Sequence, residues 1–156
     1  MTAKRPPRSR RRTDEQGQVG GVEALAFGVL VFVLGMLGMA TAWAVVDAKV
    51  AAASAAREAA RSYVESDGSV TAWDDAVGRG REAFAGHGRS PAALEMPRPV
   101  ERFGRCAPVT VTAVTNVDLP RIPGIRAVAR RVRVQASHTE VIDPFRAGLG
   151  RGVACA

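Results

Sequence analysis

One segment of the chain is apolar without a break. From Ala24 to Val46 there are 23 residues, and none of them carries a charge. As an α-helix this segment would be about 35 Å long, enough to cross a hydrocarbon core of about 30 Å with some tilt. Trp43 stands near its far end, where an indole ring suits the membrane interface. The pattern predicts a transmembrane helix. The alternative is a helix buried in a soluble core, but the remaining residues offer too little apolar surface to wrap it.

The helical pattern continues beyond the apolar segment. Residues 47–65 are rich in alanine, the best helix former, and contain neither glycine nor proline. Arg61 stands three residues after Glu58 and four before Glu65, spacings that allow ion pairs along a helix. Asp67-Gly68 is expected to end the helix. One face consists mostly of small residues, which predicts either close packing against another element or a solvated alanine helix. These residues are Ala52, Ala56, Ala59 and Tyr63.

A second, shorter helix is predicted after this point. Ser69 or Thr71 can cap it, and two carboxylates, Asp74 and Asp75, fall in its first turn. Gly86-His87-Gly88 is expected to stop it. Its apolar residues recur at spacings that give one face, which is expected to lie in the core: Val70, Trp73, Val77 and Phe84.

Two later segments alternate between apolar and polar residues, as β-strands do. They cover residues 109–117 and 128–139, with Pro120 and Pro123-Gly124 as the turn region between them. An antiparallel hairpin alone is marginal, so its apolar face needs a cover, expected from the second helix. Residues 88–104, with three prolines, predict a linker or an extended edge segment. The fold class is therefore α+β, with a long N-terminal transmembrane helix continuing outside the membrane, a second short helix and an antiparallel β-hairpin or small sheet.

Charge is distributed unevenly along the chain. The net charge is +7, and the first 15 residues hold six basic residues against two acidic ones. The positive-inside rule places this end in the cytoplasm and the rest outside the cell membrane. The predicted divisions are a basic leader at 1–18, a transmembrane and extended helix at 19–66, and an exported α+β head at 67–156. The basic stretch contains no aromatic residue, which argues against a nucleic-acid partner.

A cleaved secretory signal is the alternative to a permanent anchor. Ala40-Thr41-Ala42 and Ala42-Trp43-Ala44 both have the small-x-small pattern of a cleavage site. The apolar segment is longer than the usual hydrophobic region of a signal peptide, and its helical pattern runs through both sites.

A single carboxylate, Glu23, stands at the entrance of the apolar segment. Near the N-terminal end of a helix it faces the positive end of the helix dipole. Paired with the N-terminal amine of a neighbouring subunit, it could fix axial register; the alternative is an interfacial carboxylate with no partner. Within the apolar segment, Ala24 with Gly28 and Gly38 with Ala42 are small-xxx-small pairs of the kind that suits helix contact.

Taken together, these features resemble the TadE-like family, minor-pilin-like proteins of bacterial tight-adherence pili, in an actinobacterial form. The features that carry the resemblance are the basic leader, Val22-Glu23, the apolar helix and the sequence AAREAAR at 55–61; a weaker part is SHTE at 137–140 with DPF at 143–145. The resemblance implies a lipid bilayer, other pilin-like subunits and pilus assembly proteins as partners.

The same resemblance implies cleavage by a prepilin peptidase after a glycine or similar small residue, with the glutamate fifth in the mature chain. A cut between Gln18 and Val19 places Glu23 fifth, whereas a cut after Gly17 places it sixth.

The two cysteines are Cys106 and Cys155. Outside the membrane an oxidising setting favours a disulfide between them, which would close a loop of about 50 residues and stabilise the fold by about 4 kcal/mol. Two thiols that do not pair with each other are the alternative.

No pattern of catalytic residues is found. His87 lies among glycines, and His138 points toward the apolar face of its strand; with two cysteines they give no close-spaced metal ligands. No nucleophile motif or phosphate-binding loop is present, so neither enzymatic activity nor a cofactor is predicted. The preferred hypothesis is a single-pass pilin-like protein that assists assembly of a tight-adherence type pilus or secretion filament. The alternative is a solitary membrane-anchored extracytoplasmic binding module.

Overall fold

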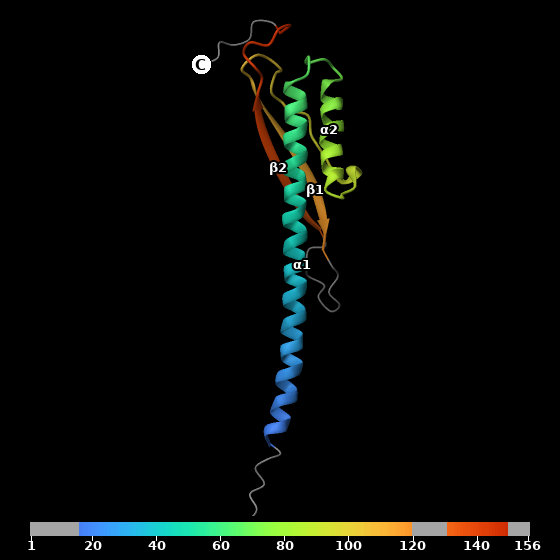
Figure 1. Ribbon diagram of the computed structural model, residues 1–156, viewed down its shortest axis with the longest axis vertical. Coiled ribbons are helices and arrows are strands. Elements are labelled where there is room, and N and C mark those ends of the chain that lie inside the picture. Colours follow the sequence, from blue (N-terminus) through green and yellow to red (C-terminus); the bar gives the residue numbers. More distant parts are fainter. Residues whose placement is uncertain (1–15, 120–130, 150–156) are drawn as a thin grey trace, which may run out of the picture. The chain divides into compact units, whose positions relative to one another are not determined.

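The computed structural model describes residues 16–119 and 131–149, with side chains from Glu23 onward. The described elements are α1 (Gln16–Val64), α2 (Ala72–Gly86), a short 3-10 helix η1 (Pro91–Ala93), β1 (Pro108–Asp118) and β2 (Arg131–Val141) (Figure 1). The α+β class with a long first helix, a shorter second helix and an antiparallel pair of strands is confirmed. The expected turn residues Pro120, Pro123 and Gly124, and the start of the second strand at Val128, lie outside the described residues.

The chain divides into two compact units, residues 1–40 and residues 41–156. The described part of the first unit is the N-terminal portion of α1. The second unit, called the head below, contains the rest of α1 with all the other elements. The second unit includes the alanine-rich part of α1 because this part belongs to the unit's core. The predicted divisions at residues 18 and 66 concern membrane topology and stay predictions.

The alanine face of α1 is the centre of the head's core. It packs against the hairpin, where Ala113 and Ala136 are cross-strand partners. Because alanine carries only a methyl group, the helix and the strands can approach closely. The predicted close packing of this face is therefore confirmed, and the solvated alanine helix is excluded. The alanines that are fully buried are Ala48, Ala51, Ala52, Ala55, Ala56, Ala59 and Ala60.

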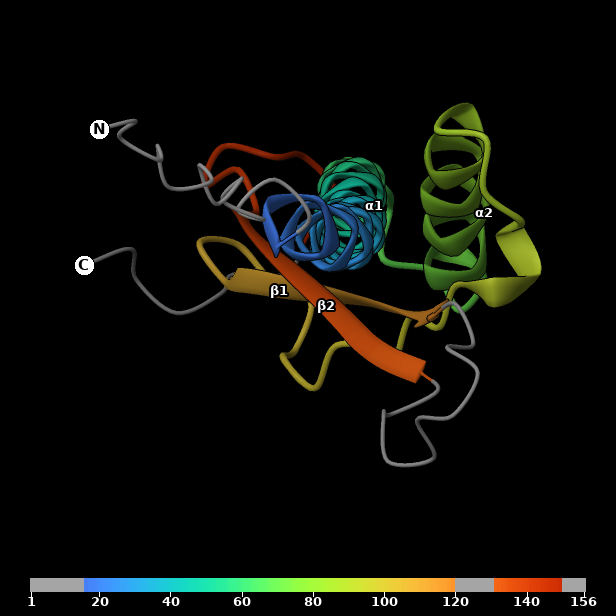
Figure 2. The same cartoon turned by 90° about the horizontal axis from the view of Figure 1, so that it is seen from below.

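Larger side chains fill the space where α2 and the loops join this face. Tyr63 makes edge-on ring contacts with Trp73 of α2, at 5.5 Å between ring centroids, and with Phe103, at 5.3 Å. Phe84 of α2 and Leu94 are also buried, beside the alanines of α1. Seen along the helix axis, α1 lies against the hairpin and α2 lies beside them (Figure 2). The expected cover of the hairpin by α2 is confirmed only in part: α2 contributes to two of the three buried clusters that include the strands, whereas α1 contributes to all three.

The connection between α1 and α2 is fixed by local hydrogen bonds. Ser69 donates its backbone N–H to Asp67 Oδ1 at 2.9 Å, and this hydrogen bond lowers the pKa of the Asp67 carboxyl. Gly68 has φ +72°, and a Cβ there would lie 2.4 Å from the Phe103 ring, so only glycine fits. Arg146, beyond β2, donates to the carbonyls of Val64 and Glu65 and so satisfies acceptors left open at the end of α1.

Two expectations about α2 need correction. Thr71 does stand at the N-cap position, but its side chain makes no capping hydrogen bond; its hydroxyl lies 3.2 Å from that of Ser69 instead. Val70 was expected on the buried face and is 86% exposed, because it belongs to the connection before the helix begins. Trp73 and Phe84 are buried as expected, and α2 ends at Gly86 as expected.

β1 and β2 form a two-stranded antiparallel sheet with an unbroken register from Pro108 opposite Val141 to Asp118 opposite Arg131. Thr110 and Thr139, and Thr112 and Ser137, share hydroxyl hydrogen bonds across the strands, at 2.9 Å and 3.0 Å. Part of the segment between η1 and β1 follows the outer edge of β1, where Glu95 forms an isolated bridge with Val114. The predicted extended edge segment is therefore confirmed at this point.

The two glycines of α2 provide a matched test of close packing. A Cβ on Gly80 would lie 3.1 Å from the Ala55 carbonyl oxygen of α1 and 2.9 Å from Met96 Sδ, whereas a Cβ on Gly78 would meet nothing within 4 Å. We expect Gly78→Ala to raise the free energy of unfolding by about 0.5–1 kcal/mol through helix propensity. We expect Gly80→Ala to show no such gain, because its added methyl group overpacks the contact with α1. Its free energy of unfolding is expected to be about 1–3 kcal/mol lower than that of Gly78→Ala.

Denaturant unfolding of the two variants in detergent, followed by Trp73 fluorescence with Trp43 replaced by phenylalanine, measures the difference. Equal stabilisation by both substitutions would show that α2 does not approach α1 this closely.

Candidate membrane and assembly surfaces

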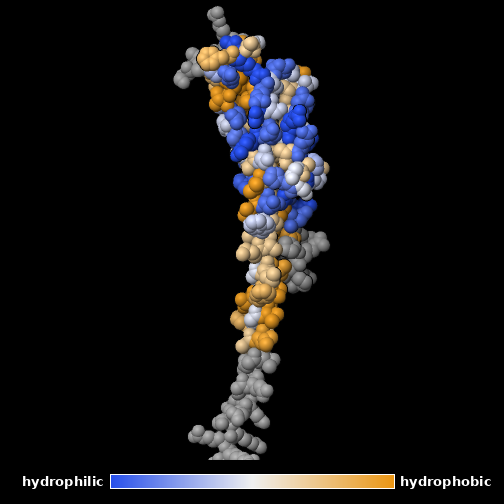
Figure 3. All heavy atoms as spheres, viewed as in Figure 1, coloured by the Kyte–Doolittle hydropathy of each residue, from blue (hydrophilic) through white to orange (hydrophobic). Residues whose placement is uncertain are grey.

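The N-terminal part of α1 presents an apolar surface on all sides. From Glu23 to Ala40 every side chain is exposed except Leu37, which is half-buried, and the exposed residues include Leu25, Phe27 and Phe32. Hydrophobic colours dominate the described part of this segment in the space-filling view (Figure 3). Among the described residues one helix, Glu23–Val64, is long and apolar enough to cross a bilayer. Apolar surface of this extent needs lipid or protein against it.

Glu23 is exposed and lies on the helix, as do the backbones of Gly17, Gln18 and Val19. The side chains of these last three lie outside the described residues. Either expected cleavage point therefore falls within the first turn of α1.

The small residues of the apolar segment have room for a partner. A Cβ on Gly28 or Gly38 would meet nothing within 4 Å, and Ala24 and Ala42 are exposed. The pair at 24 and 28 is repeated 14 residues later at 38 and 42, which is about four helical turns, so both pairs share nearly one face. Their role in helix contact stays a prediction.

An ion pair joins α1 to the segment that follows α2. Asp47 is the first charged residue after the apolar run, and Arg89 donates to its Oδ2 from Nε at 3.2 Å and from Nη2 at 2.8 Å. Nη2 also donates to the Ala44 carbonyl at 3.2 Å. The Arg89 side chain is 21% exposed. This site was missed from the sequence, where Arg89 was one arginine of a proline-containing linker and nothing indicated its partner.

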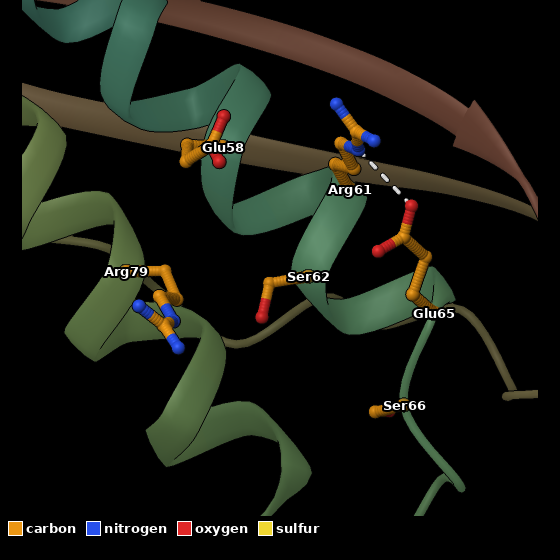
Figure 4. Close-up of a pocket in the computed structure, with 6 residues that line it drawn as sticks. All are labelled: Glu58, Arg61, Ser62, Glu65, Ser66 and Arg79. Carbon is orange, nitrogen blue, oxygen red and sulfur yellow. Dashed lines mark hydrogen bonds and ion pairs between the residues drawn. The ribbon is translucent and has the colours of Figure 1, made fainter.

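A polar cleft of about 580 Å³ lies between the end of α1 and the middle of α2. Figure 4 shows α1 and the residues just after it supplying five of its side chains, while Arg79 comes from α2. Arg61 donates to Glu65 at 3.0 Å, and this hydrogen bond raises the pKa of the Arg61 guanidinium. Both side chains are about two-thirds exposed, so the pair contributes little stability. The cleft is lined by charged and hydroxyl side chains, with neither histidine nor cysteine among its lining residues: Glu58, Arg61, Ser62, Glu65, Ser66 and Arg79.

The two histidines lie apart from each other in the fold. His87 is exposed just after α2, whereas His138 is half-buried on the inner face of β2, as expected, with Nε2 2.9 Å from Glu140 Oε1. Within residues 16–119 and 131–149 no three His, Cys, Asp or Glu side chains lie close enough to hold a metal ion.

Cys106 precedes β1 and has φ +58°. Its N–H donates to the Ile142 carbonyl at 2.9 Å, beside the end of β2. Its expected partner, Cys155, lies outside the described residues, so the pairing stays a prediction.

Comparison with known proteins gives no relative. No family model, no curated protein and no solved structure matches the chain. The features that bear on function are therefore the two parts of α1 and the surfaces of the head.

The Asp47–Arg89 pair can be tested by a double-mutant cycle. Because Arg89 is mostly buried and makes three charge-assisted contacts, we expect Arg89→Gln to lower the free energy of unfolding by about 1–2 kcal/mol. We expect a coupling energy with Asp47→Asn of about 1 kcal/mol.

The matched control is the exposed pair Arg79–Glu82, with side chains 66% and 71% exposed, for which coupling of about 0.5 kcal/mol or less is expected. Denaturant unfolding of the wild type and of the single and double variants of both cycles provides the measurement. Equal coupling in the two cycles would contradict a special role for Arg89.

Proposed function

We propose that this protein is a single-pass, pilin-like membrane protein that assists assembly of a tight-adherence type pilus or secretion filament. The observation that carries the proposal is the change of surroundings along one helix. The N-terminal part of α1 has large apolar side chains exposed on every side, and the later part has an alanine face buried in the head. A helix that anchors in lipid and also forms the spine of a small α+β head suits a pilin-like subunit.

In the proposed mechanism the apolar part of α1 makes lateral contacts with other helices in the membrane. The small pairs Ala24/Gly28 and Gly38/Ala42 would let a neighbouring backbone approach closely, since without bulky side chains dispersion contacts form at short range. Glu23 would pair with the N-terminal amine of an adjacent subunit. Such a pair fixes axial register, because either charge alone would be costly at the edge of the lipid.

The proposed orientation puts the N-terminus in the cytoplasm and the head outside the cell membrane. The excess of basic residues before α1 supports this orientation. Asp47, the first charge beyond the apolar run, would then lie at the outer surface, held by Arg89. The head would serve in the selection of partners.

A second candidate function is a solitary membrane-anchored binding module outside the cytoplasm. It is favoured by the position of Gly17, the glycine just upstream of the bond between Gln18 and Val19, because a cut after Gly17 would make Glu23 the sixth rather than the fifth residue of the mature chain. A chain that is never cut keeps its basic leader and a fixed anchor, and it has no new amine to pair with Glu23.

Membrane insertion and processing can be measured together. We expect the protein to stay in the membrane pellet after alkaline carbonate extraction, and protease added to spheroplasts to digest the head. N-terminal sequencing of the mature protein is expected to begin at Val19 or at Gln18, and Glu23→Gln is expected to weaken co-purification with pilin-like subunits.

Release by carbonate would contradict the anchor, and a mature terminus near Ala44 would show secretion. An intact leader would favour the second candidate function. Glu23→Asp, which keeps the charge, is the matched control for co-purification.

We further propose a disulfide between Cys106 and Cys155, formed after export. If the two thiols pair, Cys106→Ser, Cys155→Ser and the double variant lose the same bond. The free energy of unfolding is then expected to fall by the same amount, about 2–4 kcal/mol, in all three variants. Intact mass before and after reduction and alkylation counts the thiols. The disulfide would be contradicted if the stability loss of the double variant equalled the sum of the two single losses. It would also be contradicted if both thiols were alkylated without prior reduction.

A further inference from the structure

Among the residues that the structure describes, no strand pairs with the outer edge of β2 in the sheet of the head. β1 and β2 are the two strands of the sheet within the described residues, and β1 has Glu95 on its outer side at Val114. Glu95 N–H donates to the Val114 carbonyl at 2.9 Å, and Val114 N–H donates to the Glu95 carbonyl at 2.8 Å. Both backbone groups of Val114 therefore point away from β2.

This geometry fixes which groups of β2 face outward. In an antiparallel pair, a residue that points its N–H and C=O away from the partner strand stands opposite a residue that does the same. Val114 stands opposite Gln135, so Gln135 directs its backbone groups to the free edge. Lys49 of α1 donates to the Gln135 carbonyl, which agrees with this direction. With an unbroken register, the odd-numbered residues of β2 share the same orientation: Arg131, Arg133, Gln135, Ser137, Thr139 and Val141.

An apolar groove runs beside this edge. Its volume is about 500 Å³, and it lies between one turn of α1 and the first part of β2. Val46 and Val50 on the helix side are 54% and 52% exposed. Every second side chain of a strand added to β2 would point toward this turn of α1. These side chains would enter the groove and contact its valines. The lining residues are Val45, Val46, Lys49, Val50, Val132, Arg133, Val134 and Gln135.

The charges along the groove have one sign. Lys49 and Arg133 line it, and neither forms an ion pair with any carboxylate of the part of the chain that the structure describes. Arg131, at the start of β2, is already paired with Asp118 at 2.8 Å. A segment that lies here with a carboxylate near Lys49 or Arg133 would gain a charge-assisted contact.

We propose that the free edge of β2 accepts an extended segment of a partner protein as an added strand. The segment alternates apolar and polar residues, with its apolar side chains in the groove and acidic side chains facing Lys49 and Arg133. Main-chain hydrogen bonds supply affinity and the groove supplies specificity, as in other cases of strand addition. Lys49, which covers one carbonyl of the edge, would turn to the partner's carboxylate.

A second copy of this chain does not suit the edge. Two β2 edges joined antiparallel would be related by a two-fold axis across the strands. Since β2 and α1 of the head both run lengthwise (Figure 1), the Thr41 ends of the two helices would then point in opposite directions. A head-to-tail arrangement would use the outer edge of β1, where Glu95 is already bonded to Val114. A parallel pairing of two β2 edges, about a two-fold axis along the strands, would turn the odd-numbered β2 side chains of one copy toward the apolar groove of the other, and all of these except Val141 are polar. The occupant is therefore a segment of another protein, and this holds whether or not a filament forms.

The full chain in phosphatidylcholine nanodiscs provides the test, with a synthetic peptide of about nine residues that alternates valine with glutamate and threonine. We expect this peptide to bind and to slow amide hydrogen exchange of Arg133, Gln135 and Ser137. Two further peptides carry N-methyl groups on every second residue, in opposite phase. We expect one phase to bind at least about tenfold more weakly and the other to bind like the parent, because an added strand turns alternate N–H groups toward β2.

Variants locate the site. We expect Val50→Asp to weaken peptide binding by about tenfold or more. We expect Arg133→Glu to weaken binding of the glutamate peptide as well, and a peptide with lysine in place of glutamate to restore binding to this variant. Val70→Asp, at a residue 86% exposed in the connection between α1 and α2, is the matched control and should bind as the parent does. Trp73 fluorescence checks that each variant is folded.

Three results would overturn the proposal. The first is equal binding of both N-methylated phases. The second is protection of residues 133–137 without peptide when phosphatidylglycerol replaces phosphatidylcholine, which would make lipid the occupant. The third is protection that rises with the number of copies per nanodisc, which would indicate self-association.

Discussion

The close contact between the alanine face of α1 and its neighbours is the constraint on which the head depends. Seven alanines of this face are fully buried. Ala113 and Ala136 meet them from the sheet, and Gly80 meets them from α2. Small side chains on both sides bring backbones together, but each of them buries little apolar area. The larger side chains at the margins, such as Tyr63, Trp73 and Phe84, therefore fix the positions of the surrounding elements. A larger residue on the face would separate the layers, since the contact has no space to absorb it.

α1 has an exposed apolar surface in its N-terminal part and a buried alanine face in its later part. The helical backbone is continuous, and only the side chains change along it. Large apolar residues dominate up to Val46, and alanines alternate with charged residues from Asp47 onward. The backbone hydrogen bonds of a helix are satisfied internally, which suits both lipid and a packed core. The Asp47–Arg89 pair stands where the composition changes. It ties the segment after α2 back to α1 with contacts to both a carboxylate and a carbonyl. The proposed functions share this feature: an anchored helix that becomes the spine of a small head.

The two edges of the sheet differ in a way that bears on partners. Glu95 occupies the outer edge of β1 at Val114, whereas within residues 16–119 and 131–149 the edge of β2 has the single contact of Lys49. Proteins often protect free edges with lysine, since an exposed edge invites pairing. Here the lysine stands above an apolar groove, near Arg133, which forms no ion pair within the part of the chain that the structure describes. The same residues that protect the edge would recognise an acidic segment. The polar cleft between α1 and α2 has no comparable apolar lining.

The sequence alone determined what depends on local order along the chain. A 23-residue uncharged segment, an alanine-rich continuation and period-two alternation are properties of neighbouring residues, so α1, α2 and the hairpin follow from them. The Glu23 position and the small pairs of the apolar segment are also readable in this way, although their partners are not. Only the tertiary structure decided that α1 as well as α2 covers the hairpin, that Gly80 lies against Ala55, that Arg89 reaches Asp47 and that Gln135 faces an open edge. These contacts join residues far apart in sequence, and their partners depend on how the backbones approach, which neither residue type nor spacing records.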